Sequence, residues 1–325
     1  MLLFALQATR ELGAVVAQEL GTSLAAHEER SFEDGEHKSR PLVDPNGEDV
    51  YVMQSLHGGP TLSGDEKLMR LLLFIATLRD HGARRVTAVV PYLAYARKDR
   101  RTKPFDPVSF RVIAQLLEAA GTDALITLET HNIAAFDNAL RLRAIHLDPG
   151  DLFASAAERM VGADPVVIAS PDVGGIKRVQ LWRERLEMRW KRPLGQAFVE
   201  KRRSAGVVSG GTVVAGDVAG ATVLLLDDLI ATFGTIARAA DALLQGGARR
   251  VVAFAAHGLF VGAAAETLLA SRVERLVVTD SVPPFRLTGR PAMQRVEVLS
   301  SAALFAGAIR SQSAAALRIA EARER

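Results

Sequence analysis

The sequence GARRV at residues 82–86 returns as GARRV at residues 247–251. In both places a stretch with helical periodicity precedes it and an apolar stretch of strand length follows it. The next expected strands also correspond, since TDALIT at 122–127 aligns with VERLVV at 273–278. Two copies of one helix–strand unit, with a seam near 147–150, explain this echo. Chance similarity between two helix–strand junctions is the alternative.

The composition limits the class of protein and the kind of site. Apolar residues make up 49% of the 325 residues, so the chain can bury a substantial core, and its length allows about two domains. Lys and Arg number 40 against 37 Asp and Glu, and the net charge of +3 is too weak to indicate a nucleic-acid binder. The absence of cysteine excludes disulfides and thiolate chemistry, so oxygen or imidazole must hold any metal.

The apolar stretches are too short for a membrane protein. None approaches the ~20 residues that a membrane helix needs. Arg10 and Glu11 interrupt the moderately apolar N-terminal stretch, which argues against a signal peptide. We therefore expect a cytoplasmic protein without a membrane partner.

The alternation of short apolar stretches with longer helical ones predicts an α/β fold, with parallel sheets flanked by helices. Strands are expected at residues 49–54, 86–91, 124–128, 166–170, 221–226, 251–256 and 276–279. Helices are expected at residues 66–80, 107–120, 173–186, 235–245 and 302–311. Pro107 suits the first turn of its helix, where its missing N–H is not needed.

The segment DDLIATFGT at residues 227–235 follows one of these strands and precedes a helix. The carboxyl end of a parallel strand opens into the ligand crevice, and the backbone N–H groups of 232–235 at a helix N-terminus favour a phosphate. Asp227 and Asp228 suit ribose hydroxyls or a magnesium ion. The pairing predicts a sugar-phosphate site; a helix N-cap with surface acids is the alternative.

Two further residues that follow strands are candidate ligands. Asp172, in SPDVGG at residues 170–175, fits a hard cation, and equally a helix N-cap without any ligand. His131 follows the strand at 124–128. Taken alone, it is more typical of a packed or capping imidazole.

Two basic clusters also follow expected strands. YARKDRRTK at residues 95–103 suits a polyphosphate, with nucleic acid or a solvated loop as alternatives. EKRR at 200–203 precedes the small-residue stretch 204–211, which suits a mobile flap that brings cations to a transferring phosphoryl group. An ordinary basic hairpin would also explain it. The turn FEDGE at 32–36 could hold a nucleotide base or be a plain surface turn.

In this order and spacing the segments resemble the ribose-phosphate pyrophosphokinase family, from the first strand to the last helix. Its members carry a Phe-x-Asp-Gly-Glu turn, seen at 32–36, and a Pro-Tyr-x-x-Tyr-Ala-Arg-x-Asp-Arg segment, seen at 91–100. The resemblance implies two tandem type I phosphoribosyltransferase-type domains. The first covers residues 1–148 and is completed by a helix at 300–318, and the second covers 149–299 and carries the ribose-5-phosphate loop.

The resemblance also implies a role for each candidate residue. It assigns Mg²⁺ to His131 and Asp172, and it makes Lys201 and Arg203 the catalytic pair of the flap. The residues implied for ATP are Phe32, Asp34, Gly35, Glu36, Arg97, Lys98, Asp99 and Arg100. Those implied for ribose 5-phosphate are Arg203, Asp227, Asp228, Ala231, Thr232, Phe233, Gly234 and Thr235.

The implied reaction transfers the β,γ-diphosphoryl group of ATP to the C1 hydroxyl of ribose 5-phosphate, giving phosphoribosyl pyrophosphate and AMP. The family implies an active site between the domains of a homo-oligomer, from dimer to hexamer, whose neighbouring subunit contributes to the adenine pocket. The loop ATFGT at 231–235 departs from the usual Asp-Thr-Gly-Gly-Thr, so Phe233 must point away from the phosphate or alter the pocket. A different sugar-phosphate acceptor and a non-catalytic subunit that regulates a synthetase are the alternatives.

Overall fold

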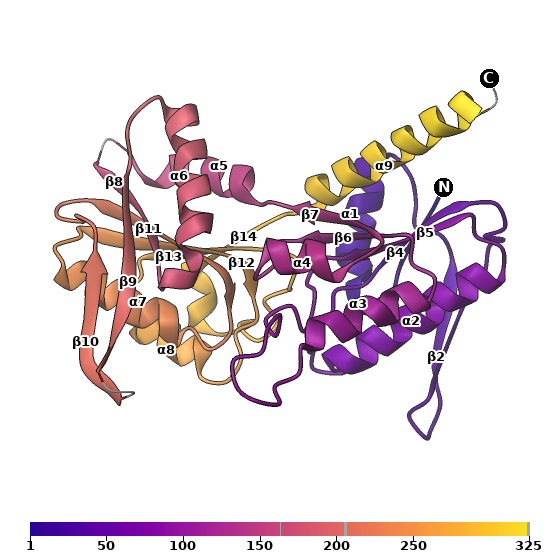
Figure 1. Ribbon diagram of the computed structural model, residues 1–325, viewed down its shortest axis with the longest axis horizontal. Coiled ribbons are helices and arrows are strands. Elements are labelled where there is room, and N and C mark those ends of the chain that lie inside the picture. The colour runs from indigo at the N-terminus through magenta and orange to yellow at the C-terminus, as the bar shows by residue number, and fades with distance from the viewer. Residues whose placement is uncertain (163, 205–206, 324–325) are drawn as a thin grey trace. The chain divides into compact units, whose positions relative to one another are not determined.

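The computed structural model describes residues 1–162, 164–204 and 207–323, with the side chains of 201–212 and 314–323 outside the description. The chain divides into two units. Unit 1 comprises Met1–Asp148 and Ser300–Arg325, and unit 2 comprises Pro149–Leu299. Each unit has a mainly parallel sheet between two layers of helices (Figure 1). The expected α/β class is confirmed.

The sheet of unit 1 has five parallel strands in the order β1-β4-β5-β6-β7. Its strands are β1 (Leu2–Ala5), β4 (Asp49–Met53), β5 (Arg85–Val90), β6 (Ala124–Leu128) and β7 (Arg143–Leu147). The helices α2 (Gly64–Asp80), α3 (Ser109–Ala119) and α4 (Ile133–Ala139) pack on one face, and α1 (Arg10–Leu20) and α9 (Ala302–Arg323) on the other. All of β4 and β6 is buried, which explains their apolar sequences.

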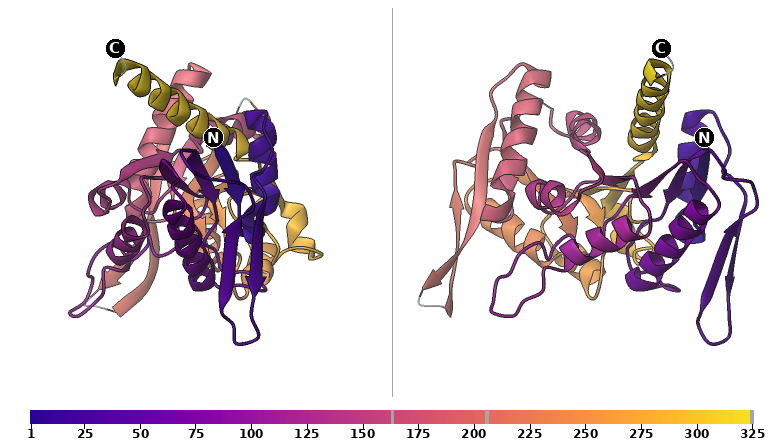
Figure 2. Two further views of the ribbon diagram at one scale, coloured as in Figure 1. Left: turned by 90° about the vertical axis from the view of Figure 1, so that its right-hand side faces the viewer. Right: turned by 45° about the vertical axis from the view of Figure 1, so that its right-hand side comes forward.

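A hairpin interrupts the crossover from β1 to β4 in unit 1. It consists of β2 (His27–Ser31) and β3 (His37–Pro41), which pair antiparallel as a sheet of their own. A short 3-10 turn, η1 (Gln7–Thr9), precedes α1. Figure 2 shows the hairpin extending away from the rest of unit 1. Its tip carries residues 32–36.

The sheet of unit 2 has seven strands in the order β10-β9-β8-β11-β12-β13-β14. They are β8 (Val166–Ser170), β9 (Gly195–Ser204), β10 (Val207–Ala215), β11 (Thr222–Ile230), β12 (Arg250–Gly258), β13 (Arg275–Thr279) and β14 (Val296–Leu299). The β9–β10 pair is antiparallel and the other pairs are parallel. Helices α5 (Gly150–Met160) and α6 (Ile176–Trp190) cover one face, and α7 (Gly234–Gln245) and α8 (Ala264–Ala270) the other.

The repeated sequence forms the same helix end in both units. Gly82 and Gly247 have φ of +81° and +95°, the left-handed region that glycine adopts at low cost. The carbonyl of each glycine accepts a hydrogen bond at 2.9 Å from a glycine amide before the preceding strand, Gly47 or Gly220. The residues just before the next strands, β6 and β13, also match. The amide of Asp123 donates to the carbonyl of Val86, and the amide of Glu274 donates to the carbonyl of Val251. The echo is therefore structural as well as sequential.

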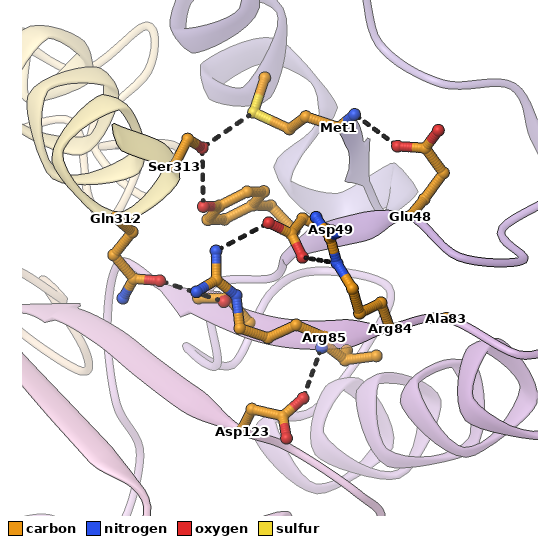
Figure 3. Close-up of polar contacts among 12 residues, drawn as sticks. Met1, Glu48, Asp49, Ala83, Arg84, Arg85, Asp123, Gln312 and Ser313 are labelled. Atoms are coloured by element: carbon orange, nitrogen blue, oxygen red, sulfur yellow. Dashed lines mark hydrogen bonds and ion pairs between the residues drawn. The ribbon is translucent and has the colours of Figure 1, made fainter. Parts of the chain in front are cut away.

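Helix α9 follows unit 2 in sequence but packs on unit 1. Phe305 on its inner face is fully buried against the sheet. The hydroxyl of Tyr51 on β4 lies 3.0 Å from Oγ of Ser313, and Oγ1 of Thr87 on β5 donates to buried Gln312 at 3.3 Å (Figure 3). Apolar packing and these polar contacts both fix the helix to the sheet.

Several elements differ in extent from the sequence-based expectation. Helix α3 begins at Ser109 after an N-cap at Val108, whose ψ of 76° is not helical, so Pro107 lies before the helix. Residues 173–175 form a separate 3-10 turn, η2 (Val173–Gly175), before α6. Strand β11 runs on to Ile230, because Asp227 and the residues after it still pair with β12. Helix α9 continues well past residue 311.

Among the described residues, no helix has the combination of length and hydrophobicity needed to cross a bilayer.

The burial of Phe305 predicts how much the packing of α9 contributes to the stability of unit 1. We expect Phe305→Ala to lower the free energy of unfolding of unit 1 by about 3–5 kcal/mol, since it removes a fully buried ring. Urea denaturation followed by circular dichroism measures it. Both tryptophans, Trp182 and Trp190, lie in α6, so their fluorescence reports separately on unit 2. Phe105→Ala, at a fully exposed ring, is the control; an equal loss there would contradict the prediction.

Candidate functional site

Two adjacent carboxylates lie near the carboxyl end of β11. Asp228 is 5% exposed, and Arg178 of α6 forms an ion pair with it at 3.7 Å. Asp227 is partly buried and accepts a hydrogen bond from the amide of Asp228 at 2.9 Å. Burial and repulsion from Asp228 raise the pKa of Asp227 well above its usual value. The pair is therefore suited to hydrogen-bond donors, such as the hydroxyls of a sugar.

The loop after β11 leads into the N-terminus of α7, which begins at Gly234. Phe233 is its N-cap residue and has a φ of +66°. Its ring is 2% exposed and belongs to the apolar core between the sheet and the helices α7 and α8. The ring therefore points into the core and away from the loop surface, where Thr232 is exposed. The backbone N–H groups at the start of α7 keep the arrangement that suits a phosphate.

Two arginines beside this loop stand outside the motifs that mark the site in the sequence. Arg178 is the third residue of α6 and pairs with Asp228. Arg238 lies one turn into α7 and donates to Oγ1 of Thr235 at 3.4 Å. A cation near the N-terminus of a helix faces the positive end of the dipole, which is unfavourable unless an anion lies close by. An arginine in the first turns of a helix is therefore the sequence signal from which both residues could be predicted to lie near an anion.

Asp172 lies at the carboxyl end of β8 and caps η2. Its Oδ1 accepts a hydrogen bond from the amide of Gly174 at 2.8 Å, and Oγ of Ser170 donates to its carbonyl at 2.6 Å. Gly175 must be small, because an added Cβ would lie 2.4 Å from that hydroxyl. The capping interpretation is thus correct, and the exposed carboxylate still has its Oδ2 for a ligand.

His131 lies beyond the carboxyl end of β6 in unit 1 and is exposed. Within the described residues, no three His, Asp or Glu side chains come together in a metal-binding group. Magnesium keeps several waters and is usually bound by one or two carboxylates together with substrate phosphates. His131 and Asp172 are each exposed on their own unit, and imidazole nitrogen and carboxylate oxygen are both possible ligands for a metal that arrives with its polyphosphate.

The basic segment after β5 is folded by its own contacts. Lys98 forms an ion pair with Asp106, and this contact, with hydrogen bonds from Thr102, lowers the pKa of the Asp106 carboxyl. Oδ2 of Asp99 accepts a hydrogen bond from Nδ2 of Asn132 at 2.7 Å, next to His131. The ammonium group of Lys98 is therefore held in place by Asp106 and Thr102, and it keeps a third N–H donor.

Arg97 and Arg100 are exposed, and neither forms a hydrogen bond or ion pair with another described residue. The loop around them is held by Tyr95, whose hydroxyl donates to Asp65 at the start of α2. Tyr95 has a φ of +66°, so a strained residue turns the backbone here. Two uncommitted guanidinium groups on a fixed loop suit a polyphosphate.

The turn at the tip of hairpin β2–β3 is closed by its own backbone. The amide of Phe32 donates to the carbonyl of Glu36 at 2.9 Å, and the amide of Glu36 donates to Oδ1 of Asp34 at 3.0 Å. Gly35 has a φ of +91°, which the turn requires. The guanidinium of Arg30 lies 5.1 Å from the centre of the Phe32 ring. The turn thus presents an aromatic ring and carboxylates together.

Lys201 and Arg203 lie on β9, opposite Thr212 and Val208 of β10, and the pairing is irregular between these two positions. The side chains of both residues lie outside the described part of the structure. Their backbone belongs to the long antiparallel hairpin β9–β10 of unit 2.

Comparison with known proteins assigns the two ends of the chain. Residues 1–121 match a family model described as the N-terminal domain of ribose phosphate pyrophosphokinase. Residues 207–314 match the phosphoribosyl synthetase-associated domain.

Curated relatives and a solved structure match nearly the whole chain. The ribose-phosphate pyrophosphokinase of Agrobacterium fabrum is 33% identical, over 95% of this chain and 96% of its own length. That of Caldanaerobacter subterraneus is 35% identical, over 92% and 90%. The crystal structure of phosphoribosylpyrophosphate synthetase from Mycobacterium smegmatis matches with a TM-score of 0.86 and 32% identity, covering 95% of this chain and 97% of that one.

The left-handed backbone at Phe233 predicts an unusual order of stabilities. Phe233→Ala and Phe233→Gly both lose the buried ring, which costs about 3–5 kcal/mol. The glycine variant also relieves the backbone, so we expect it to be more stable than the alanine variant by about 1–2 kcal/mol. Urea denaturation followed by tryptophan fluorescence measures both. An alanine variant as stable as the glycine variant would contradict the prediction.

The raised pKa of Asp227 predicts a pH-dependent gain in stability on its removal. Folding tightens proton binding at this carboxyl, so its contribution to stability falls as the pH rises above the ordinary value of 3.8. We expect Asp227→Asn to be more stable than the wild type at neutral pH, and the gain to shrink as the pH approaches that value. Urea midpoints across the pH range test this. Asp151→Asn, at a 76% exposed carboxylate, should show no such trend.

Proposed function

The chain belongs to the ribose-phosphate pyrophosphokinase family, and we propose how its own residues carry out that family's reaction. It is an enzyme that transfers the β,γ-diphosphoryl group of ATP to the C1 hydroxyl of ribose 5-phosphate. The hydroxyl oxygen attacks the β-phosphorus and loses its proton, the bond to the α-phosphate oxygen breaks, and AMP leaves. The fold is two tandem type I phosphoribosyltransferase domains, as the family resemblance implies.

We assign the first domain to residues 1–148 with the helix at 300–318, and the second to 149–299. The division of the chain into units 1 and 2 supports this assignment. We further propose that the enzyme is a cytoplasmic homo-oligomer, from dimer to hexamer, as the family implies.

The observation that carries the proposal for ribose 5-phosphate is the loop between β11 and α7. The inward-facing ring of Phe233 leaves the loop surface to backbone N–H groups at a helix N-terminus, which suit the 5-phosphate. Asp227 and Asp228 accept hydrogen bonds from the ribose hydroxyls, and a donor there relieves the repulsion within the pair. The remaining loop residues that we assign to this substrate are Ala231, Thr232, Gly234 and Thr235.

ATP is proposed to bind to unit 1. Phe32 stacks on adenine while the carboxylates of Asp34 and Glu36 and the backbone of Gly35 meet its edge. The exposed Arg97 and Arg100 bind the phosphates, with Asp99 and Lys98 completing the segment. Lys98 contributes through the N–H donor that Asp106 and Thr102 leave to it.

Magnesium is proposed to be held by His131 and Asp172 together with the phosphates of ATP. When bound, the ion neutralises charge on the phosphate oxygens. The capping hydrogen bond from Gly174 fixes Oδ1 of Asp172 and so orients its second oxygen. Neither side chain is buried, in keeping with a metal that enters with the substrate.

Lys201 and Arg203 are proposed to stabilise the negative charge that develops on the transferring group. Their positions on the hairpin β9–β10 support this role, because both residues lie beyond Phe198, where the pairing of β9 with β8 ends. Arg203 also contributes to ribose 5-phosphate.

Phe233 and Ala231 are the two loop residues that bear on which sugar phosphate accepts the diphosphoryl group. Since the ring of Phe233 lies in the core, it does not narrow the sugar-phosphate pocket, which supports ribose 5-phosphate over another acceptor. Ala231 stands where the family usually has an aspartate, so the loop lacks only that side-chain carboxylate.

Purified enzyme with ATP, Mg²⁺ and ribose 5-phosphate should give AMP and phosphoribosyl pyrophosphate in equal amounts. We expect Lys201→Ala and Arg203→Ala each to lower kcat roughly 10²–10³-fold, because each removes a cation from the transition state. Arg202→Ala, between them, is the matched control and should lower it far less. A well-folded wild type that releases no AMP would overturn the proposal, and AMP release with another sugar phosphate alone would change the acceptor.

A further inference from the structure

A buried carboxylate that the reaction does not use lies midway along β2 of the hairpin β2–β3. The side chain of Glu29 is 7% exposed. Its Oε1 accepts a hydrogen bond from the amide of Gln7 at 2.6 Å and lies 3.1 Å from Nε2 of His27. Its Oε2 lies 3.9 Å from Nε2 of His37 and 4.0 Å from Nη1 of Arg70. We call His27, Glu29, His37 and Arg70 the Glu29 cluster.

The Glu29 cluster joins four separate elements. Two of its members lie on β2, one on β3 and one on α2, and the amide of Gln7 comes from η1. A two-stranded hairpin is marginally stable on its own, so its position depends on contacts with the rest of the unit. His27 adds packing, since its ring lies 6.0 Å from that of Phe4 and 5.6 Å from that of Phe74. The cluster supplies the polar part of the attachment.

The cluster holds both strands at the point where they enter and leave the turn at residues 32–36. Nη2 of Arg70 donates to Oγ of Ser31 at 3.2 Å, directly before Phe32. His37 follows Glu36 directly and lies against Glu29. A change in this cluster is therefore transmitted over one residue on each side to the tip of the hairpin.

The charges of the cluster make Glu29 its centre. Burial raises the pKa of Glu29, but the hydrogen bonds from His27 and from the Gln7 amide outweigh it, and the net pKa is lowered. Burial and the nearby Arg70 lower the pKa of His37. The cluster thus contains an ionised, buried carboxylate facing a cation. Removing that charge leaves its partners unsatisfied in a buried site, which is costly.

We propose that Glu29 is a positioning residue that fixes the turn at residues 32–36 for the adenine of ATP. The inference rests on the proposed assignment of this turn to adenine. Glu29 does not touch substrate. It holds the hairpin against α2 and η1, and this attachment fixes the position of the turn. Because the turn meets only the base, a loosened hairpin weakens ATP binding and leaves the chemistry and the second substrate unchanged.

The test compares Glu29→Gln with Glu28→Gln in the full-length enzyme. Glu28 is the neighbouring residue on β2, and its 40% exposed carboxylate pairs with Arg40 across the hairpin. Calorimetric titration with Mg·ATP alone, without ribose 5-phosphate, should show ATP binding weakened about tenfold in Glu29→Gln, as expected for the loss of one charged, buried contact. The KM for ATP should rise likewise, with kcat and the KM for ribose 5-phosphate unchanged. Glu28→Gln should match the wild type.

Hydrogen exchange gives a second readout. In Glu29→Gln without ATP, the amides of residues 27–41 should exchange faster, whereas those of the five-stranded sheet should not. Glu29→Asp, which keeps the charge, should recover part of the ATP affinity. If Glu29→Gln does not fold, Arg70→Gln replaces it, since it removes the cation from α2 and leaves the hairpin sequence intact.

Unchanged ATP affinity in a folded Glu29→Gln or Arg70→Gln variant would overturn the inference, and so would a fall in kcat without a change in the KM for ATP. The binding arm separates this outcome from failure of the proposed function. A wild type that binds ATP but produces no AMP contradicts the reaction, and the effect of Glu29 on ATP binding can still be measured.

Discussion

Parallel pairing of strands is the constraint on which both units depend. A parallel strand can be reached only by a crossover, so helices cover both faces and the central strands are buried. Every crossover then leaves the sheet at the carboxyl ends of its strands. In unit 2 that edge collects Asp172, the acid pair of β11 and the loop before α7. In unit 1 it collects the basic segment after β5 and His131 after β6.

Each unit departs from this pattern once, and at the same place. The hairpin β2–β3 follows β1 and α1, and the hairpin β9–β10 follows β8 and α6; both lead into the next parallel strand. Antiparallel strands need only a short turn, so a hairpin can be inserted into a crossover. In unit 1 the inserted strands form a sheet of their own, and in unit 2 they extend one edge of the main sheet. The turn at 32–36 and the strand that carries Lys201 and Arg203 therefore belong to hairpins inserted at the same stage of each unit, after its first strand and the helix that follows.

The sequence predicts best the strands that are buried on both faces of a sheet, because this burial requires a run of apolar residues. The apolar runs at 124–128 and 166–170 coincide with β6 and β8, whereas β2 (HEERS) escaped prediction because every one of its residues is polar and cross-element contacts hold it. The phosphate loop was predictable because its chemistry is local. The pairing of Arg178 with Asp228 was not, because only the packing of α6 on the sheet brings these residues together. The direction of Phe233 depends on a backbone angle that composition does not encode.

The attachment of α9 has a consequence for synthesis. Helix α9 packs beside α1 on the face of the unit 1 sheet that corresponds to the one covered in unit 2 by α5 and α6. Helix α5 precedes its sheet in the sequence, whereas α9 follows the whole of unit 2. During translation, residues 1–148 leave the ribosome with the sites for Phe305 and Ile309 uncovered, and they stay uncovered until the final helix emerges. The domain that is made first is finished last, and in that interval its open face is apolar surface for a chaperone to bind.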